Sequence, residues 1–293
     1  MRFEGSNGLQ LAGDRWGDTG KPGDTQKPTV LFLHGGGQTR HSWDGAAASV
    51  ASRGWQAITL DSRGHGESEW SDDGDYRLMS FAEDVKLVIE ALGQPTVLVG
   101  ASLGGLASIL LAGELAPGGV RAVVLVDIVP DMEPGGADRI HSFMVERADV
   151  GFGSLEEVAD AIAAYNPHRP RPADLAGLSK NLRERDGRFY WHWDPKFISV
   201  GGGLRPSEVH DVDRLHAAVE RIVADKPMLL VRGRASDLVT SAKAATFLER
   251  FPTVEFVDVS GAGHMVAGDR NDAFTSAVVN FLDRHAATDG TRL

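Results

Sequence analysis

Short apolar runs alternate with longer segments of helical periodicity over most of this 293-residue chain. Clusters of glycine, proline and aspartate separate the two kinds of segment. Such alternation is typical of a mostly parallel sheet with helices on both faces. The pattern predicts strands at Leu9–Trp16, Thr29–Leu33, Gln56–Leu60, Thr96–Gly100, Ala122–Val126, Pro227–Val231 and Val254–Val257. It predicts helices at His41–Arg53, Phe81–Leu92, Leu103–Leu115, Ser241–Arg250 and Asp272–His285.

This alternation stops between Val126 and Pro227, where the chain becomes polar, proline-rich and helical. About a hundred residues without a convincing strand are too many for one loop. We therefore predict a helical cap at residues 131–225, inserted into an α/β core that residues 1–130 and 226–293 form. A cap in this position can cover a site on the core.

The segment Thr96–Leu106 contains the sequence Gly-Ala-Ser-Leu-Gly-Gly and carries the strongest chemical signal. Its first half is typical of a buried strand and a helical pattern starts at Leu103, so Ser102 falls at a strand-to-helix corner of the form G-x-S-x-G. Gly100 and Gly104 leave room for a sharp turn, and the N–H groups at the start of the helix favour negative charge. The segment predicts a serine nucleophile that attacks a carbonyl group.

A serine nucleophile needs a base to take its proton and a carboxylate to orient that base. Of the ten histidines, we favour His264, because it follows a predicted strand and is expected at the same sheet edge as Ser102. Asp237 follows the strand Pro227–Val231 and is the preferred acid, while Asp127, at the end of another strand, is the alternative. The chain order serine, aspartate, histidine is one of the known orders of such triads.

Attack on a carbonyl creates an oxyanion that needs two aligned donors. The N–H of Leu103 at the helix start is the first candidate. The strand Thr29–Leu33 ends in His34-Gly35-Gly36-Gly37, whose backbone can approach a substrate closely. We predict the N–H of Gly36 as the second donor, with Gly35 as the alternative. His34 is interpreted as a structural residue.

Aromatic and methionine side chains of the predicted cap could supply an apolar surface for a substrate. The alternative is that they pack the cap's own core. The candidate substrate-binding residues are Phe143, Met144, Trp191 and Trp193 of the cap, with Gly35 and Met265 of the core. Of the other polar residues, His192, Arg139 and His141 are expected at the surface, and the segment Asp61–Ser68 is expected to be a structural turn.

The amino-acid composition narrows the range of possible binding partners and cofactors. The absence of cysteine excludes disulfides and thiolate metal sites, and no metal site is predicted. A net charge of -11 disfavours nucleic acid and anionic membranes as partners. No apolar run approaches the roughly 18 residues of a membrane span, and the first residues lack the features of an export signal. We expect a cytoplasmic monomer or homodimer that acts on a small molecule.

Together these residues resemble the α/β-hydrolase superfamily, in the branch with a cap inserted after the sixth strand. The motifs that carry the resemblance are His34-Gly35-Gly36, Asp61-x-Arg63-Gly-x-Gly-x-Ser68, Gly100-x-Ser102-x-Gly104-Gly105, Asp237 and Gly263-His264. The resemblance implies an α/β-hydrolase fold with an eight-stranded sheet, a Ser-His-Asp triad, an acyl-enzyme intermediate and no cofactor.

Departures from the patterns of several branches narrow the expected chemistry. Ser102 stands where epoxide hydrolases and haloalkane dehalogenases of this fold carry aspartate, and Met265 stands where many C–C hydrolases carry tryptophan. Small-substrate esterases with an HGGG motif usually have Gly-Asp-Ser-Ala-Gly around the serine. We expect hydrolysis of an ester or lactone of a small, largely apolar substrate. The alternatives are a perhydrolase or haloperoxidase-like activity without a cofactor, C–C bond hydrolysis, or a non-catalytic small-molecule receptor.

Overall fold

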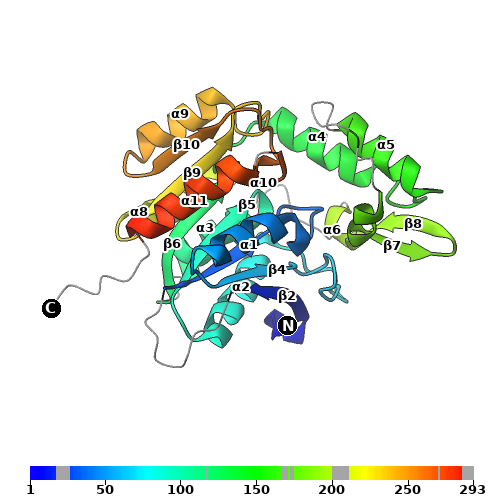
Figure 1. Cartoon of the computed structure of the whole chain (residues 1–293), viewed down its shortest axis with the longest axis horizontal. Helices are drawn as coiled ribbons and strands as arrows, with labels where there is room; N and C mark the ends of the chain where they lie inside the picture. Colours follow the sequence, from blue (N-terminus) through cyan, green and yellow to red (C-terminus); the bar gives the residue numbers. More distant parts are fainter. Residues whose placement is uncertain are drawn as a thin grey trace.

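The computed structural model describes residues 1–17, 27–115, 118–165, 171, 175–199, 211–269 and 271–285. Within these residues, eight strands form one sheet (Figure 1). Their order is β1 (Arg2–Glu4), β2 (Gln10–Trp16), β4 (Ala57–Leu60), β3 (Thr29–Leu33), β5 (Thr96–Ala101), β6 (Val120–Val126), β9 (Met228–Gly233) and β10 (Glu255–Val259). β2 pairs antiparallel with β1 and β4, and the other neighbours are parallel. The predicted mostly parallel eight-stranded sheet is confirmed.

Helices cover both faces of this sheet, as the apolar strands require. In β3, Val30 and Phe32 face one apolar cluster, while Leu31 and Leu33 face the other. One cluster is completed by α1 (Asp44–Ser52) and α11 (Asn271–His285). The other is completed by α2 (Leu78–Leu92), α3 (Leu103–Leu110), α8 (Val212–Val223) and α9 (Ser241–Arg250). None of the described helices combines the length and apolar character needed to span a membrane.

The insertion after β6 forms a separate group of elements beyond the core (Figure 1). It contains helices and also an antiparallel hairpin, which was not expected in a helical insertion. The turn of this hairpin is Asp186-Gly187, with φ of 52° and 70°. Asp-Gly is a strong signal for a two-residue hairpin turn, because both positions need positive φ. The elements are α4 (Pro134–Val145), α5 (Leu155–Tyr165), a 3₁₀ turn (Ala176–Asn181), β7 (Leu182–Arg185), β8 (Arg188–Trp191) and α6 (Pro195–Ile198).

One helix inside the range predicted for the cap lies on the core instead. α8 contacts α3 and the π-helical turn Leu111–Leu115 that continues α3. Arg214 of α8 also forms an ion pair with Glu114 of this turn, at 2.7 Å. The domain limits at residues 131 and 225 stay a prediction. The cap that lies beyond the core consists of the elements from α4 to α6, all of which precede α8.

The carboxyl ends of the six parallel strands meet at one edge of the sheet. Leu33 of β3 lies opposite Gly100 of β5, and Ala101 lies opposite Val126 of β6. The register continues across β9 to β10, where Gly233 pairs with Val259. Loops that leave these strands therefore start close together, which is the usual location of sites in open α/β sheets.

Gly104 lets α3 pack directly against β3. A Cβ on Gly104 would lie 2.4 Å from the carbonyl oxygen of Leu33, which is closer than real atoms approach. We expect Gly104→Ala to lower the free energy of unfolding by about 3 kcal/mol, because strand and helix must move apart. Urea denaturation measures this change.

Gly118→Ala is the matched control, since Gly118 is exposed and a Cβ there would have no neighbour within 4 Å. Its free energy of unfolding should change by less than about 0.5 kcal/mol. Equal stability of the two variants would contradict the proposed role of Gly104.

Candidate active site

Ser102 occupies the corner between β5 and α3, as predicted. Its backbone has φ of 45° and ψ of -114°, a strained conformation for a residue with a side chain. Gly100 makes the corner possible, because a Cβ there would lie 2.5 Å from the carbonyl carbon of Gly104. The next residue, Leu103, is the first of α3, so its N–H lies at the positive end of the helix.

The loop after β3 lies directly against this corner. A Cβ on Gly35 would be 3.3 Å from the Cβ of Ser102. The N–H of Gly35 already donates to Gln38 Oε1 at 3.1 Å, and the N–H of Gly37 donates to His65 Nε2 at 3.1 Å. Both groups therefore have partners within the protein.

The remaining N–H of this loop is that of Gly36. The carbonyl of Gly35 accepts a hydrogen bond from His34 Nδ1 at 2.8 Å. Since the C=O of Gly35 and the N–H of Gly36 belong to one trans peptide, they point in opposite directions, and the N–H is directed away from the His34 ring. Among the described residues, neither this N–H nor that of Leu103 has a hydrogen-bond acceptor. These are the two predicted donors, and both are available.

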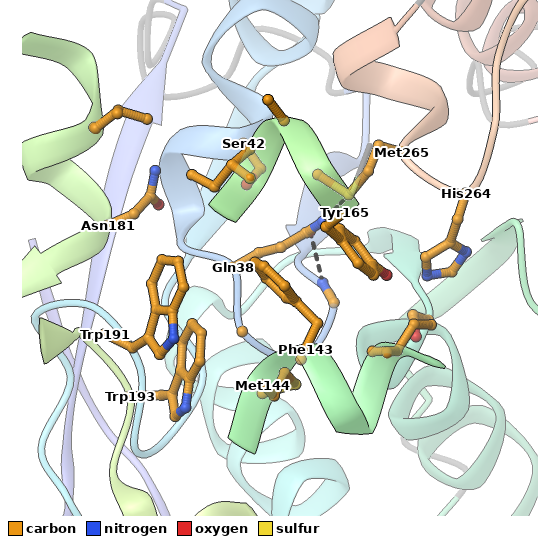
Figure 2. Close-up of a pocket in the computed structure, with 18 of the residues that line it drawn as sticks. Gln38, Ser42, Phe143, Met144, Tyr165, Asn181, Trp191, Trp193, His264 and Met265 are labelled. Atoms are coloured by element: carbon orange, nitrogen blue, oxygen red, sulfur yellow. Dashed lines mark hydrogen bonds between the residues drawn. The ribbon is translucent and has the colours of Figure 1, made fainter. Parts of the chain in front are cut away.

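A cavity of about 450 Å³ opens above Ser102. In Figure 2, Phe143 and Tyr165 stack on each other between the Trp191–Trp193 pair and His264. The ring centroids are 4.2 Å apart in the Phe143–Tyr165 pair, 5.0 Å apart in the tryptophan pair, and 5.4 Å apart between Phe143 and Trp191. The four rings thus form a continuous aromatic wall. All six predicted substrate-binding residues line the cavity, together with Ser102 and His264, and their contact with a substrate stays a prediction.

His264 bonds to Asp127 and not to the preferred acid Asp237. His264 Nδ1 lies 2.8 Å from Asp127 Oδ2. The Asp127 carboxylate is fully buried and also accepts the N–H of Gly233 at 3.0 Å and the hydroxyl of Ser236 at 2.5 Å. These donors stabilise the buried charge and fix its orientation. The structure therefore corrects the sequence-based choice in favour of the alternative.

A close backbone approach explains how His264 reaches Asp127. β9 lies between β6, which Asp127 follows, and β10, which His264 follows. A Cβ on Gly233 at the end of β9 would lie only 2.0 Å from the carbonyl oxygen of Gly263. The absence of a side chain at Gly233 thus allows the His264 loop to cross over β9. The N–H of Ala235 holds this crossing by donating to the carbonyl of Ala262 at 2.9 Å.

Asp237 contacts the cap. Its carboxylate forms an ion pair with Arg139 of α4 at 2.8 Å, and both side chains are almost half exposed. The same guanidinium lies over the Tyr165 ring, 5.0 Å from its centroid. Arg139 is therefore engaged with the protein, and Asp237 belongs to the contact between cap and core.

His264 offers its second nitrogen, Nε2, to the cavity that Ser102 also lines. In the part of the chain that the structure describes, the two side chains form no hydrogen bond with each other. Catalytic hydrogen bonds are often long without substrate and shorten in the reacting complex. The arrangement can supply a nucleophile, a base held by a carboxylate, and two donors for an oxyanion.

Three further histidines lie behind the Gly35–Gly37 loop, and burial lowers the pKa of each. His34 and His65 are fully buried, and His192 is 2 % exposed, so its expected surface position was wrong. Burial and the neighbouring His34 lower the pKa of His192 to about 3. These three rings are therefore neutral at pH 7. His65 belongs to the segment Asp61–Ser68, whose buried Asp61 accepts the N–H groups of Arg40 and Glu67.

The chain belongs to the α/β-hydrolase fold family, which matches residues 28–270. A curated relative is esterase Rv0045c of Mycobacterium tuberculosis, which is 33% identical over 92% of this chain and 85% of its own length. Its solved structure aligns with a TM-score of 0.73 at 31% identity, over 97% of this chain and 91% of that chain.

A second relative is 2-(acetamidomethylene)succinate hydrolase of Mesorhizobium japonicum. It is 30% identical over 87% of this chain and 88% of its own length. A solved structure of an E-2-(acetamidomethylene)succinate hydrolase aligns with a TM-score of 0.79 at 25% identity, over 97% of this chain and 98% of that chain. The family and the fold are thus established; one of the two relatives is named as an esterase and the other as the hydrolase of a succinate derivative.

The buried neutral histidines predict a loss of stability in acid. Because the pKa of His34, His65 and His192 is lower in the folded than in the unfolded chain, the unfolded chain binds more protons below pH 6.5. Stability should be full above this pH and should fall as pH decreases toward 4, with each such proton contributing about 1.4 kcal/mol per pH unit. Urea denaturation at pH 7.5, 6 and 5 measures the slope.

Replacing His192 by asparagine should reduce the slope of stability against pH by up to about 1.4 kcal/mol per pH unit, the contribution of one proton. Replacing the exposed His141 should leave the slope unchanged. The interpretation is contradicted if the slope is the same in the wild type and in His192→Asn.

Proposed function

We propose that this protein is a serine hydrolase that cleaves a carboxylic ester or lactone through an acyl-enzyme. The observation that carries the proposal is the 2.8 Å contact between His264 Nδ1 and the buried Asp127 carboxylate, in a cavity that also holds the strained Ser102 corner. A histidine bonded to a carboxylate through one nitrogen can act as a base through the other. The esterase relative supports ester cleavage as the reaction.

In this mechanism, the Ser102 hydroxyl attacks the ester carbonyl carbon while its proton moves to His264 Nε2. The C=O electrons move to oxygen, and the resulting oxyanion accepts hydrogen bonds from the N–H groups of Gly36 and Leu103. Asp127 stabilises the positive charge on His264. The C–O bond to the alcohol then breaks, and the alcohol leaves with the proton from His264. Water, deprotonated by His264, releases the acid from Ser102 by the same sequence.

The cavity walls favour a neutral, apolar acyl group. The described lining residues include four aromatic rings and two methionines, but no lysine, arginine, aspartate or glutamate. The polar lining groups, such as Gln38, Ser42 and Asn181, are uncharged. A carboxylate placed in such a cavity loses hydration without gaining a counter-ion. This chemistry differs from that of a succinate derivative, the compound for which the second relative is named.

A series of p-nitrophenyl esters tests the reaction and the substrate class together. We expect kcat/KM to rise from acetate through butyrate to hexanoate, by about fourfold per methylene group buried. The hemisuccinate ester, similar in length to the butyrate but charged, should react at least about tenfold more slowly than the butyrate. A fluorophosphonate should label the wild type at Ser102.

Ser102→Ala is the control: it should lose labelling and about 10⁶-fold of kcat. Wild-type protein that neither reacts with the fluorophosphonate nor hydrolyses any ester or lactone would favour a non-catalytic receptor. Faster reaction of the hemisuccinate than of the butyrate would contradict the neutral substrate class alone.

The two candidate acids give opposite predictions. Asp127→Asn should reduce kcat for the butyrate ester by about 10⁴-fold, because His264 loses the carboxylate that orients it and stabilises its charge. Asp237→Asn should keep kcat within about threefold, since it breaks a half-exposed ion pair with Arg139. Steady-state kinetics of the two variants measure this difference. The reverse order of effects would rule out Asp127 as the acid.

A further inference from the structure

His192 connects the cap to the loop that carries Gly36. It follows β8 and lies between two backbone groups of the core. Its Nδ1 accepts the N–H of Gly66 at 2.7 Å, so its proton is on Nε2. Nε2 lies 3.3 Å from the carbonyl oxygen of Gly37, to which it donates. The ring thus bridges the Asp61–Ser68 turn and the Gly35–Gly37 loop.

We propose that His192 is a positioning residue through which the cap sets the place of the Gly36 N–H in the oxyanion hole. This inference rests on the proposed function. It makes the rate of ester cleavage depend on a cap side chain that does not line the cavity above Ser102.

Gly37 has no side chain that could anchor it, so its peptide groups must hold it in place. Its φ of 76° is in the region that favours glycine. Its N–H donates to His65 on one side, and its C=O accepts from His192 on the other. Because Gly37 directly follows Gly36, a shift of the Gly37 backbone also moves the N–H of Gly36, which is the predicted oxyanion donor. Donors in such sites must lie about 3 Å from the developing charge, and their position must be correct to within about 0.5 Å.

The surroundings of His192 fit a rigid, neutral bridge. Its ring centroid lies 5.3 Å from that of Trp193 and 5.7 Å from that of His65. The next residues anchor the same segment to the core, since the N–H of Asp194 donates to the carbonyl of Gly64 at 2.8 Å and its carboxylate accepts the Tyr76 hydroxyl at 2.6 Å. Burial lowers the pKa of His192 and keeps Nδ1 free to accept.

Two near-isosteric substitutions separate the two hydrogen bonds. His192→Asn places an amide oxygen near the position of Nδ1, so it keeps the bond from Gly66 and loses the bond to Gly37. His192→Gln can place an amide N–H near the position of Nε2, so it keeps the bond to Gly37. We expect His192→Asn to reduce kcat for the p-nitrophenyl butyrate ester about tenfold with KM within twofold. His192→Gln should keep kcat within about threefold.

Affinity for a trifluoromethyl ketone distinguishes positioning from a general loss of structure. Ser102 Oγ adds to the ketone carbon, its proton passes to His264, and the resulting oxyanion occupies the oxyanion hole. The inhibition constant should rise about tenfold in His192→Asn, in parallel with the fall in kcat. The exposed cap histidine His141 serves as the control, and His141→Asn should change neither quantity. The proposal is wrong if His192→Asn is folded and matches the wild type in both quantities.

A measurement on the wild type keeps the inference testable if the variants do not fold. Histidine ¹⁵N chemical shifts should show a neutral ring with its proton on Nε2 for His192 from pH 8 to pH 5. A ring that titrates near pH 6.5, or that carries its proton on Nδ1, would overturn the proposal. Failure of the proposed function looks different, because the wild type would then resist both the fluorophosphonate and the ketone while His192 kept this tautomer.

Discussion

The close approach of two backbones at the end of β9 is the constraint on which the whole site depends. Gly233 has no side chain, so the loop through Gly263 crosses over the end of β9. His264 thereby reaches the end of β6, the neighbour of β9 on the other side from β10. There it meets Asp127, whose buried carboxylate is already held by Gly233 and Ser236. A side chain at Gly233 would push the loop of His264 away from β9 and so separate the histidine from the carboxylate of Asp127. The pairing of Asp127 with His264 is thus a consequence of packing between segments that are distant in sequence.

Local signals in the sequence were enough to predict the sheet, Ser102 and His264, but not the acid. A serine at a strand-to-helix corner and a histidine after the last strand are each recognised within a few residues. Asp127 directly follows one buried strand, and Asp237 lies in the loop after another, so both were expected at the same edge of the sheet and periodicity did not separate them. The difference lies in the path of the loop around Gly233, which depends on contacts between segments distant in sequence. The hairpin at Asp186-Gly187 was a different case, since its turn signal was present in the sequence.

The loop after β9 serves the site and the cap at the same time. Ser236 donates to Asp127, while the next residue, Asp237, binds Arg139 of α4. The helix α4 also lies close to this loop, because a Cβ on Gly136 would be 2.5 Å from the carbonyl oxygen of Asp237. The cap is therefore packed on the same few residues that hold the Asp127 carboxylate. This sharing explains why an aspartate with the sequence context of a triad acid has a structural role.

The environment of each histidine determines its chemistry. His34 and His65 donate from Nδ1 to backbone carbonyls, at Gly35 and Arg63, and accept through Nε2, so each stays neutral and acts as a fixed connector. His192 has the opposite tautomer, because a backbone N–H points at its Nδ1. His264 alone among these four rings bonds to a carboxylate, which stabilises the protonated ring that a base must become. Of these four identical side chains, three thus bond to backbone groups, and one bonds to a carboxylate and is the proposed base. Their roles follow from the partner of each Nδ1, which the fold determines and the spacing of histidines in the sequence does not reveal.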